Sequence, residues 1–130
     1  MKIMVGYDGT DVSKRGLELA IEHAKAFDGN VFIVTALTQS SDLELKDIEM
    51  AERLLRDAEL TCTEQKIQSE KHLLVNDLEP GESLVQFSKD NKIDEIIVGV
   101  RRTSKVGKFL FGSTAQYVIL EAQCPVATIK

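Results

Sequence analysis

Hydrophobic residues follow two alternating patterns along the chain. In the first pattern, short runs are almost wholly apolar, which predicts strands buried on both faces of a sheet. These runs cover 2–7, 31–37, 71–76, 95–100 and 125–129. In the second pattern, apolar positions recur every three or four residues opposite charged ones, which predicts amphipathic helices over 12–27, 43–69, 80–89 and 112–122. Asp11 is the expected N-cap of the first helix.

Strands that alternate with helices form parallel sheets, so the sequence predicts an α/β fold with an open, twisted, five-stranded parallel sheet and helices on both faces. Right-handed crossovers can cover both faces only if the strand order reverses somewhere. Ligands of such sheets bind at that reversal, beyond the carboxyl ends of the strands. This rule selects three loops, at 8–11, 36–39 and 99–114. The 130 residues contain no linker and are expected to form a single domain, 1–130.

The chain is acidic, with 16 Lys+Arg against 21 Asp+Glu and a net charge of −5. Nucleic acids and anionic membranes favour basic surfaces, so neither is an expected partner. No apolar run reaches the ~18 residues that suggest a transmembrane helix, and the N-terminal run is too short for a signal peptide. Cys62 and Cys124 belong to no CxxC or Cys/His cluster, which favours reduced thiols. We therefore expect a cytoplasmic protein.

The loop after the fourth strand differs from the rest of this acidic chain. It carries four cations within eight residues, Arg101, Arg102, Lys105 and Lys108. It ends at Gly112-Ser113-Thr114, at the predicted start of a helix, where free backbone N–H groups and the helix dipole favour an anion. Asp8, at the end of the first strand, could accept hydrogen bonds from a ribose or a base across the cleft. The sequence therefore predicts an anion site suited to the phosphates of a nucleotide.

Other kinds of chemistry find less support. Gly107-Lys108 lacks the preceding glycine and the following Ser or Thr of a P-loop. His23 and His72 have no companions at metal-ligand spacing, so no intrinsic metal site and no metal-based catalysis are expected. A slow nucleotide hydrolase stays open as an alternative, with Asp8 holding Mg²⁺ or orienting water. A signalling receiver domain phosphorylated at Asp77 is a weaker alternative, because Gly9 stands where an acidic pair is needed.

Several segments together resemble the universal stress protein family over the whole chain. The run from Ile3 to Thr10 matches the family's opening strand and its Asp-Gly-Ser/Thr turn, and the run from Leu78 to Leu84 matches a helix start. The most specific stretch runs from Gly99 to Ala127 and contains the family's nucleotide loop: Gly, two residues, Gly, nine residues, then Gly-Ser/Thr. The resemblance implies a Rossmann-like sheet of order 3-2-1-4-5. It also implies a regulatory or stress-response role, and the sequence shows no general base or metal cluster that would favour an enzyme.

The resemblance also implies a ligand, a set of binding residues and a partner. The ligand would be ATP or AMP, with or without Mg²⁺. Its adenine and ribose would be flanked by Tyr7, Asp8 and Ala36. Val98 and Gly99 would form the floor, and Arg101 would lie near the phosphates. The residues that would hold the phosphates at the helix start are Gly112, Ser113, Thr114 and Ala115. Family members commonly form homodimers by pairing their final strands, which here would be 125–129.

One position departs from the family's pattern: the second glycine of the loop motif is Arg102. An arginine at this position either crowds the path of the backbone along the ligand or supplies positive charge in place of the glycine. A member that has lost its nucleotide and acts only through protein contacts is therefore the alternative function.

Overall fold

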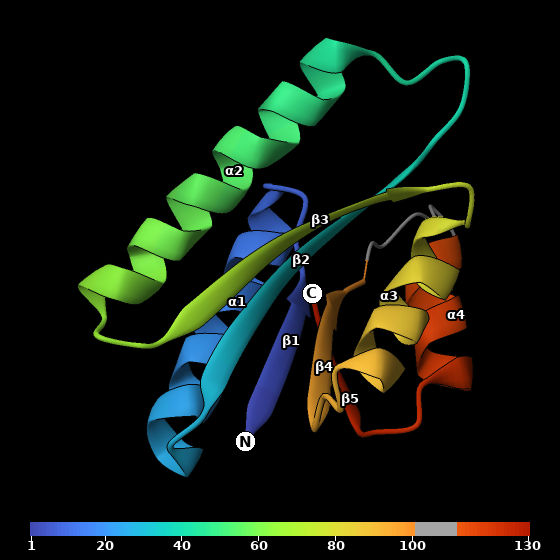
Figure 1. Ribbon diagram of the computed structural model, residues 1–130. Coiled ribbons are helices and arrows are strands. Elements are labelled where there is room, and N and C mark those ends of the chain that lie inside the picture. Colours follow the sequence, from blue (N-terminus) through green and yellow to red (C-terminus); the bar gives the residue numbers. More distant parts are fainter. Residues whose placement is uncertain (101–111) are drawn as a thin grey trace.

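The computed structural model describes residues 1–100 and 112–130. Strands and helices alternate along the chain, as Figure 1 shows. In order they are β1 (Lys2–Gly6), α1 (Asp11–Phe27), β2 (Asn30–Thr38), α2 (Leu45–Glu64), β3 (Ser69–Asn76), α3 (Pro80–Asp90), β4 (Glu95–Gly99), α4 (Ser113–Glu121) and β5 (Val126–Ile129).

The strands form one parallel sheet in the order β3-β2-β1-β4-β5. The predicted α/β fold and strand order are therefore confirmed. The order reverses between β1 and β4, because the chain adds β2 and β3 on one side of β1 and then returns to place β4 and β5 on the other. A crevice is expected at this reversal, beyond the carboxyl ends of β1 and β4.

Two hydrophobic clusters cover the two faces of the sheet. In the first, Leu17 and Ala20 of α1 and Leu55 of α2 pack on strand residues such as Val5 and Ile33. In the second, Leu84 of α3 and Val118 of α4 pack on residues such as Met4, Val34 and Val98. Neighbouring strand residues alternate between the two clusters, as expected for a sheet buried on both faces. Figure 1 shows α1 and α2 on one side of the sheet and α3 and α4 on the other.

Two predicted element boundaries were wrong. The N-cap of α1 is Thr10 rather than Asp11, because the Thr10 side-chain oxygen accepts a hydrogen bond from Ser13 N–H at 3.3 Å. The long helix ends at Glu64, not near residue 69: Lys66 adopts a left-handed φ of 60°, and Ser69 and Glu70 already pair with β2.

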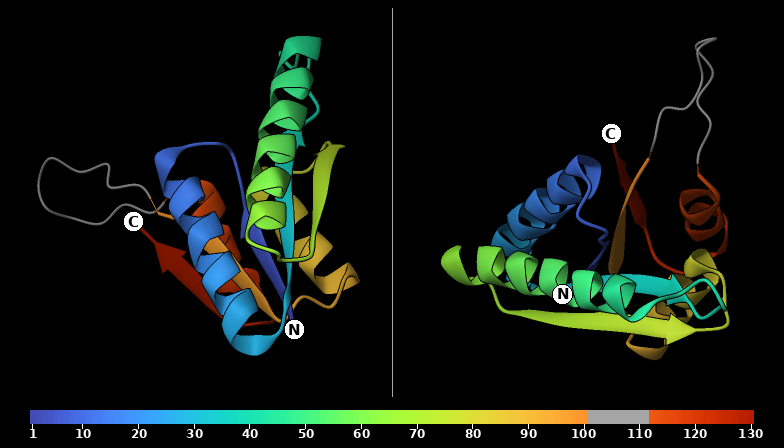
Figure 2. Two further views of the ribbon diagram at one scale, coloured as in Figure 1. Left: turned by 90° about the vertical axis from the view of Figure 1, so that its left-hand side faces the viewer. Right: turned by 90° about the horizontal axis from the view of Figure 1, so that it is seen from above.

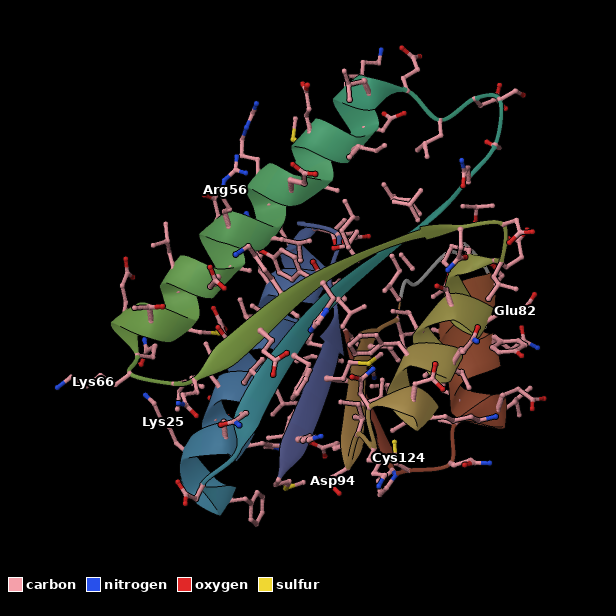
Figure 3. All side chains as sticks on the ribbon, viewed as in Figure 1. Lys25, Arg56, Lys66, Glu82, Asp94 and Cys124 are labelled. Atoms are coloured by element: carbon pink, nitrogen blue, oxygen red, sulfur yellow. The ribbon has the colours of Figure 1, made fainter. Side chains whose placement is uncertain are left out.

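The outer surface of α2 is charged, and Figure 3 shows Arg56 directed away from the sheet. In the described part of the chain, no helix combines the length and apolarity needed to cross a membrane. Both views in Figure 2 place the C-terminus near the start of α1, where Arg15 Nε donates to the Lys130 carbonyl at 2.8 Å.

Candidate functional site

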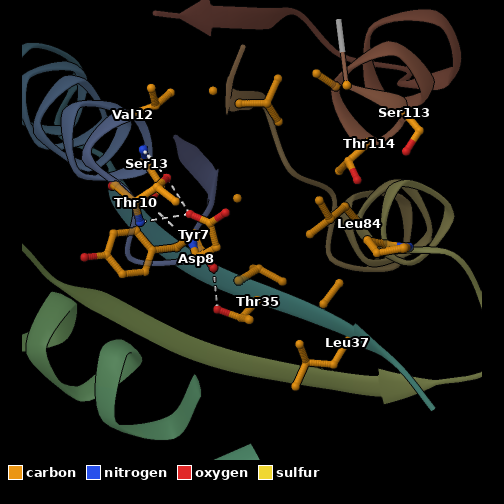
Figure 4. A pocket seen from close by; sticks show the side chains of 18 residues that line it. Tyr7, Asp8, Thr10, Val12, Ser13, Thr35, Leu37, Leu84, Ser113 and Thr114 are labelled. Carbon is orange, nitrogen blue, oxygen red and sulfur yellow. Dashed lines mark hydrogen bonds between the residues drawn. The ribbon is translucent and has the colours of Figure 1, made fainter. Parts of the chain in front are cut away.

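A cavity of about 420 Å³ lies where the strand order reverses, beyond the carboxyl ends of β1, β2 and β4. This volume is within the usual range for small-molecule sites. Figure 4 shows side chains from the start of α1, from β2 and from the starts of α3 and α4 around it. The lining residues are Gly6, Tyr7, Asp8, Thr10, Val12, Ser13, Val34, Thr35, Ala36, Leu37, Pro80, Leu84, Val98, Gly99, Gly112, Ser113, Thr114 and Ala115.

The structure brings most of the sequence-predicted site residues together in this cavity. They are Tyr7, Asp8, Ala36, Val98, Gly99, Gly112, Ser113, Thr114 and Ala115. The predicted cations Arg101 and Arg102 lie outside the described residues, as do Lys105 and Lys108. The described lining contains one charged side chain, the carboxylate of Asp8.

The turn after β1 holds Asp8 in place through short hydrogen bonds. Its Oδ1 atom accepts from Thr10 N–H at 3.0 Å and from Thr10 Oγ1 at 2.6 Å. Gly9 adopts a φ of 80°, which favours glycine, and a Cβ atom there would lie 2.8 Å from both methyl carbons of Leu54. The hydrogen bonds to Asp8 therefore stabilise the turn, and the side chain of Leu54, from α2, lies close to it at Gly9.

Tyr7 lines the cavity, and its side chain is also part of the core. Its side chain belongs to the cluster under α1 and α2, and Figure 4 shows the ring pointing away from Ser113 and Thr114. Burial raises the pKa of the phenol, and the nearby carboxylates of Asp57 and Asp8 raise it further. Tyr7 therefore does not offer its ring to the part of the cavity next to α4.

Replacing Tyr7 with phenylalanine is expected to leave ligand affinity within about twofold, since the ring packs in the core. It should also change the alkaline stability profile. The folded-state pKa of Tyr7 lies above its ordinary value of 10.0. Its stabilising contribution is therefore full below about pH 10 and is lost as the pH rises through the folded-state pKa. Urea denaturation above about pH 10 should show a shallower loss of stability in Tyr7→Phe, and equal slopes would contradict this.

The end of β1 exposes a backbone edge of β2 to the cavity. Tyr7 N–H donates to the Val34 carbonyl at 2.9 Å, so the next bond of a regular parallel ladder would join Ala36 N–H to the Tyr7 carbonyl. That bond is absent among the described residues, and the Tyr7 carbonyl instead accepts from Thr35 Oγ1 at 2.6 Å. The N–H and C=O of Ala36 therefore lie at the cavity wall. They point to the side of β2 on which β1 lies, beyond the point where β1 ends.

The first turn of α4 forms the opposite wall. Its N-cap is Gly112, which has no side chain to bond the free N–H groups, and its first turn carries no acidic residue. Gly112 has an ordinary φ of −61°, and a Cβ atom built on it would meet nothing within 4 Å. Among the described residues, neither backbone strain nor packing requires glycine here. The absent side chain leaves room for a ligand group to approach the helix amides closely.

Gly99 has a different reason to be glycine. A Cβ atom on it would lie 2.2 Å from Cγ1 of Val12, so the end of β4 and the start of α1 could not approach as they do. The two motif glycines at the cavity therefore differ: Gly99 permits packing within the protein, and Gly112 keeps space open.

Sequence reasoning missed half of the lining. Thr10 and Ser13 belong to the selected loop or the helix that follows it, and Leu37 follows Ala36 at the end of β2. Pro80 and Leu84 come from α3, whose preceding loop the strand-order rule did not select. Together with Val98, Ala36 and Leu37 they make one side of the cavity apolar, which suits a flat aromatic ring.

Other reactive groups lie away from the cavity. In the described ranges, no three His, Cys, Asp or Glu residues gather as metal ligands do. Cys124 and Asp94 precede β5 and β4, at the amino ends of the strands (Figure 3). Burial raises the pKa of the Cys124 thiol, and Asp94 and Glu95 add to this effect. Its environment favours an inert thiol over a nucleophile.

Comparison with known proteins gives a consistent result. The model of the universal stress protein family matches residues 1–130. A universal stress protein of Thermus aquaticus is 31% identical, with 98% of this chain and 97% of the relative aligned. A solved universal stress protein of Archaeoglobus fulgidus is 34% identical, with a TM-score of 0.92 and coverage of 100% of this chain and 98% of that chain. A structure of the Archaeoglobus fulgidus protein in complex with dAMP is 32% identical, with a TM-score of 0.87 and the same coverage.

Proposed function

The chain belongs to the universal stress protein family, and on that premise we propose that it is an adenine-nucleotide-binding module. AMP or ATP occupies the cavity at the carboxyl ends of the strands. The observation that carries the proposal is that one cavity joins an exposed backbone edge, at Ala36, to a helix start at Gly112 that no described side chain caps. The complex of the Archaeoglobus fulgidus relative with dAMP supports the same ligand class.

The base is recognised at the edge of β2. Adenine presents an acceptor at N1 beside a donor at its exocyclic N6, which matches a backbone N–H and C=O such as those of Ala36. Guanine presents a donor at N1 and an acceptor at O6, so the same backbone groups would be mismatched. The apolar residues Leu37, Leu84 and Val98 enclose the ring. The cavity therefore favours adenine over guanine.

The phosphate end lies at α4. The N–H groups of the first turn and the hydroxyls of Ser113 and Thr114 provide donors for one phosphate, and the helix dipole adds a favourable field. We assign further binding roles to the main chain of Tyr7, to Asp8 at the ribose, to Gly99 and Ala115, and to the cations Arg101 and Arg102 at the phosphates. Mg²⁺ accompanies ATP as part of the ligand.

Isothermal titration calorimetry tests the proposal directly. AMP is expected to bind in the micromolar range, and GMP at least about tenfold more weakly, because each mismatched buried polar group costs about 1–3 kcal/mol. ATP is titrated with and without Mg²⁺ to find which nucleotide is preferred. If neither AMP nor ATP binds at millimolar concentration, the proposal is wrong.

Such a failure would favour the second candidate, a family member that has lost its nucleotide and acts through protein contacts. The sequence observation behind it is Arg102 in place of the loop's second glycine. In either case we propose a cytoplasmic regulatory protein made of a single domain, 1–130, which forms a homodimer through β5, a strand at one edge of the described sheet. A sedimentation mass equal to one chain would rule out the dimer.

A further inference from the structure

Thr35 is a buried polar residue whose hydroxyl has a specific partner. The residue is 6% exposed, and Oγ1 donates to the Tyr7 carbonyl at 2.6 Å. In strands a threonine is readily replaced by valine, which has the same branched shape without the hydroxyl. The hydroxyl therefore needs an explanation beyond strand propensity, and its position next to Ala36 on the cavity wall suggests one.

We propose that Thr35 is a positioning residue that keeps the base-reading edge of β2 open. The inference rests on the proposed function and deepens it. The short hydrogen bond from the Thr35 hydroxyl already satisfies the buried Tyr7 carbonyl, so the strand gains little by moving Ala36 N–H toward the same oxygen. The Ala36 amide is thereby kept for the ligand, and Thr35 sets the preference for adenine without touching the base.

The strand register directs both donors, Thr35 Oγ1 and Ala36 N–H, toward the same Tyr7 carbonyl oxygen. The pairing of Gly6 with Val34, continued by one residue, places Tyr7 opposite Thr35. In a parallel pair with that register, the carbonyl of the first residue accepts from the amide that follows its partner, which here is Ala36 N–H. The Thr35 side chain reaches the same oxygen from the face that carries Tyr7. Removing the hydroxyl leaves a buried acceptor without that donor, and the nearest backbone donor in register is Ala36 N–H.

The test compares Thr35→Val, which removes the hydroxyl at nearly constant shape, with Thr35→Ser, which keeps it. In calorimetry, Thr35→Val is expected to bind AMP about tenfold more weakly, as for the loss of one hydrogen bond, with little change for GMP. The preference for AMP over GMP should therefore collapse. Thr35→Ser should retain both the affinity and the preference within about threefold. A purely structural role would weaken AMP and GMP alike.

Amide hydrogen exchange measured by NMR without nucleotide provides a readout that does not depend on binding. In Thr35→Val, Ala36 N–H should exchange at least about tenfold more slowly than in the wild type, because it now bonds to the Tyr7 carbonyl. Unchanged exchange at Ala36, or an unchanged AMP-to-GMP ratio in Thr35→Val, would overturn the inference while leaving the proposed function intact. Failure of the wild type to bind AMP would overturn the proposed function and the role of Thr35 in base preference together.

Discussion

Replacing Gly112 with aspartate is expected to stabilise the protein and abolish AMP binding. Gly112 is the N-cap of α4, with a φ of −61° and ψ of 157° that suit a capping side chain, and a Cβ atom there meets nothing within 4 Å among residues 1–100 and 112–130. An aspartate should bond the free N–H groups and interact favourably with the helix dipole, raising the free energy of unfolding by about 0.5–1 kcal/mol. The same carboxylate would occupy the proposed phosphate position and repel the ligand, lowering AMP affinity by more than about a hundredfold.

The matched control is Gly112→Asn, which caps the helix without a charge. It should stabilise the protein by a few tenths of a kcal/mol relative to glycine and weaken AMP binding less than the aspartate does. Thermal denaturation and calorimetry on the three proteins separate the two effects. Wild-type affinity in Gly112→Asp would mean that no phosphate sits at the start of α4.

The second large effect is expected from Gly99→Ala, through packing alone. The added methyl would lie 2.2 Å from Cγ1 of Val12 and 3.3 Å from its Cβ. Overpacking of this kind costs about 1–3 kcal/mol, so we expect the free energy of unfolding to fall by about 2 kcal/mol in urea denaturation. Because the contact lies at the cavity wall, AMP affinity should fall as β4 and α1 move apart.

The double mutant Gly99→Ala/Val12→Ala identifies the cause. Removing the Val12 methyls relieves the 2.2 Å contact, so a coupling of about 1 kcal/mol between the two changes is expected. Gly112→Ala is the control for glycine replacement at a cavity position without a neighbour, and it should cost under about 1 kcal/mol. Additive effects of the changes at positions 99 and 12 would refute the steric explanation.

The layered fold could be predicted from sequence because a strand buried on both faces is apolar along most of its length, so each strand could be recognised separately. Boundaries were harder where tertiary structure decides them. The apolar spacing of α2 ends at Cys62, but no Gly or Pro follows to mark the end of the helix. The chain turns at Lys66, and polar Ser69 and Glu70 become strand residues because they pair with Val31 and Phe32. Neither serine nor glutamate is among the residues that favour strands, so the local sequence does not predict a strand there.

Residues of the cavity were predicted from sequence where a motif or a loop position indicated them. Features of the cavity that arise from the pairing of strands were missed. Tyr7 continues the alternation of Ile3 and Val5, which lie in the first core cluster; that pattern alone could have assigned its ring to the core. The open edge at Ala36 could not be foreseen, since it depends on where β1 ends and on the Thr35 side chain, rather than Ala36 N–H, bonding to the Tyr7 carbonyl.

The closeness of Leu54 to Gly9 links the turn at the cavity to α2. The left-handed φ of Gly9 disfavours most other residues, and a side chain at position 9 would also require Leu54 to move. A bulkier residue at position 54 is expected to press on this turn, which also carries Asp8. The size of one side chain on α2 therefore bears on the shape of the cavity.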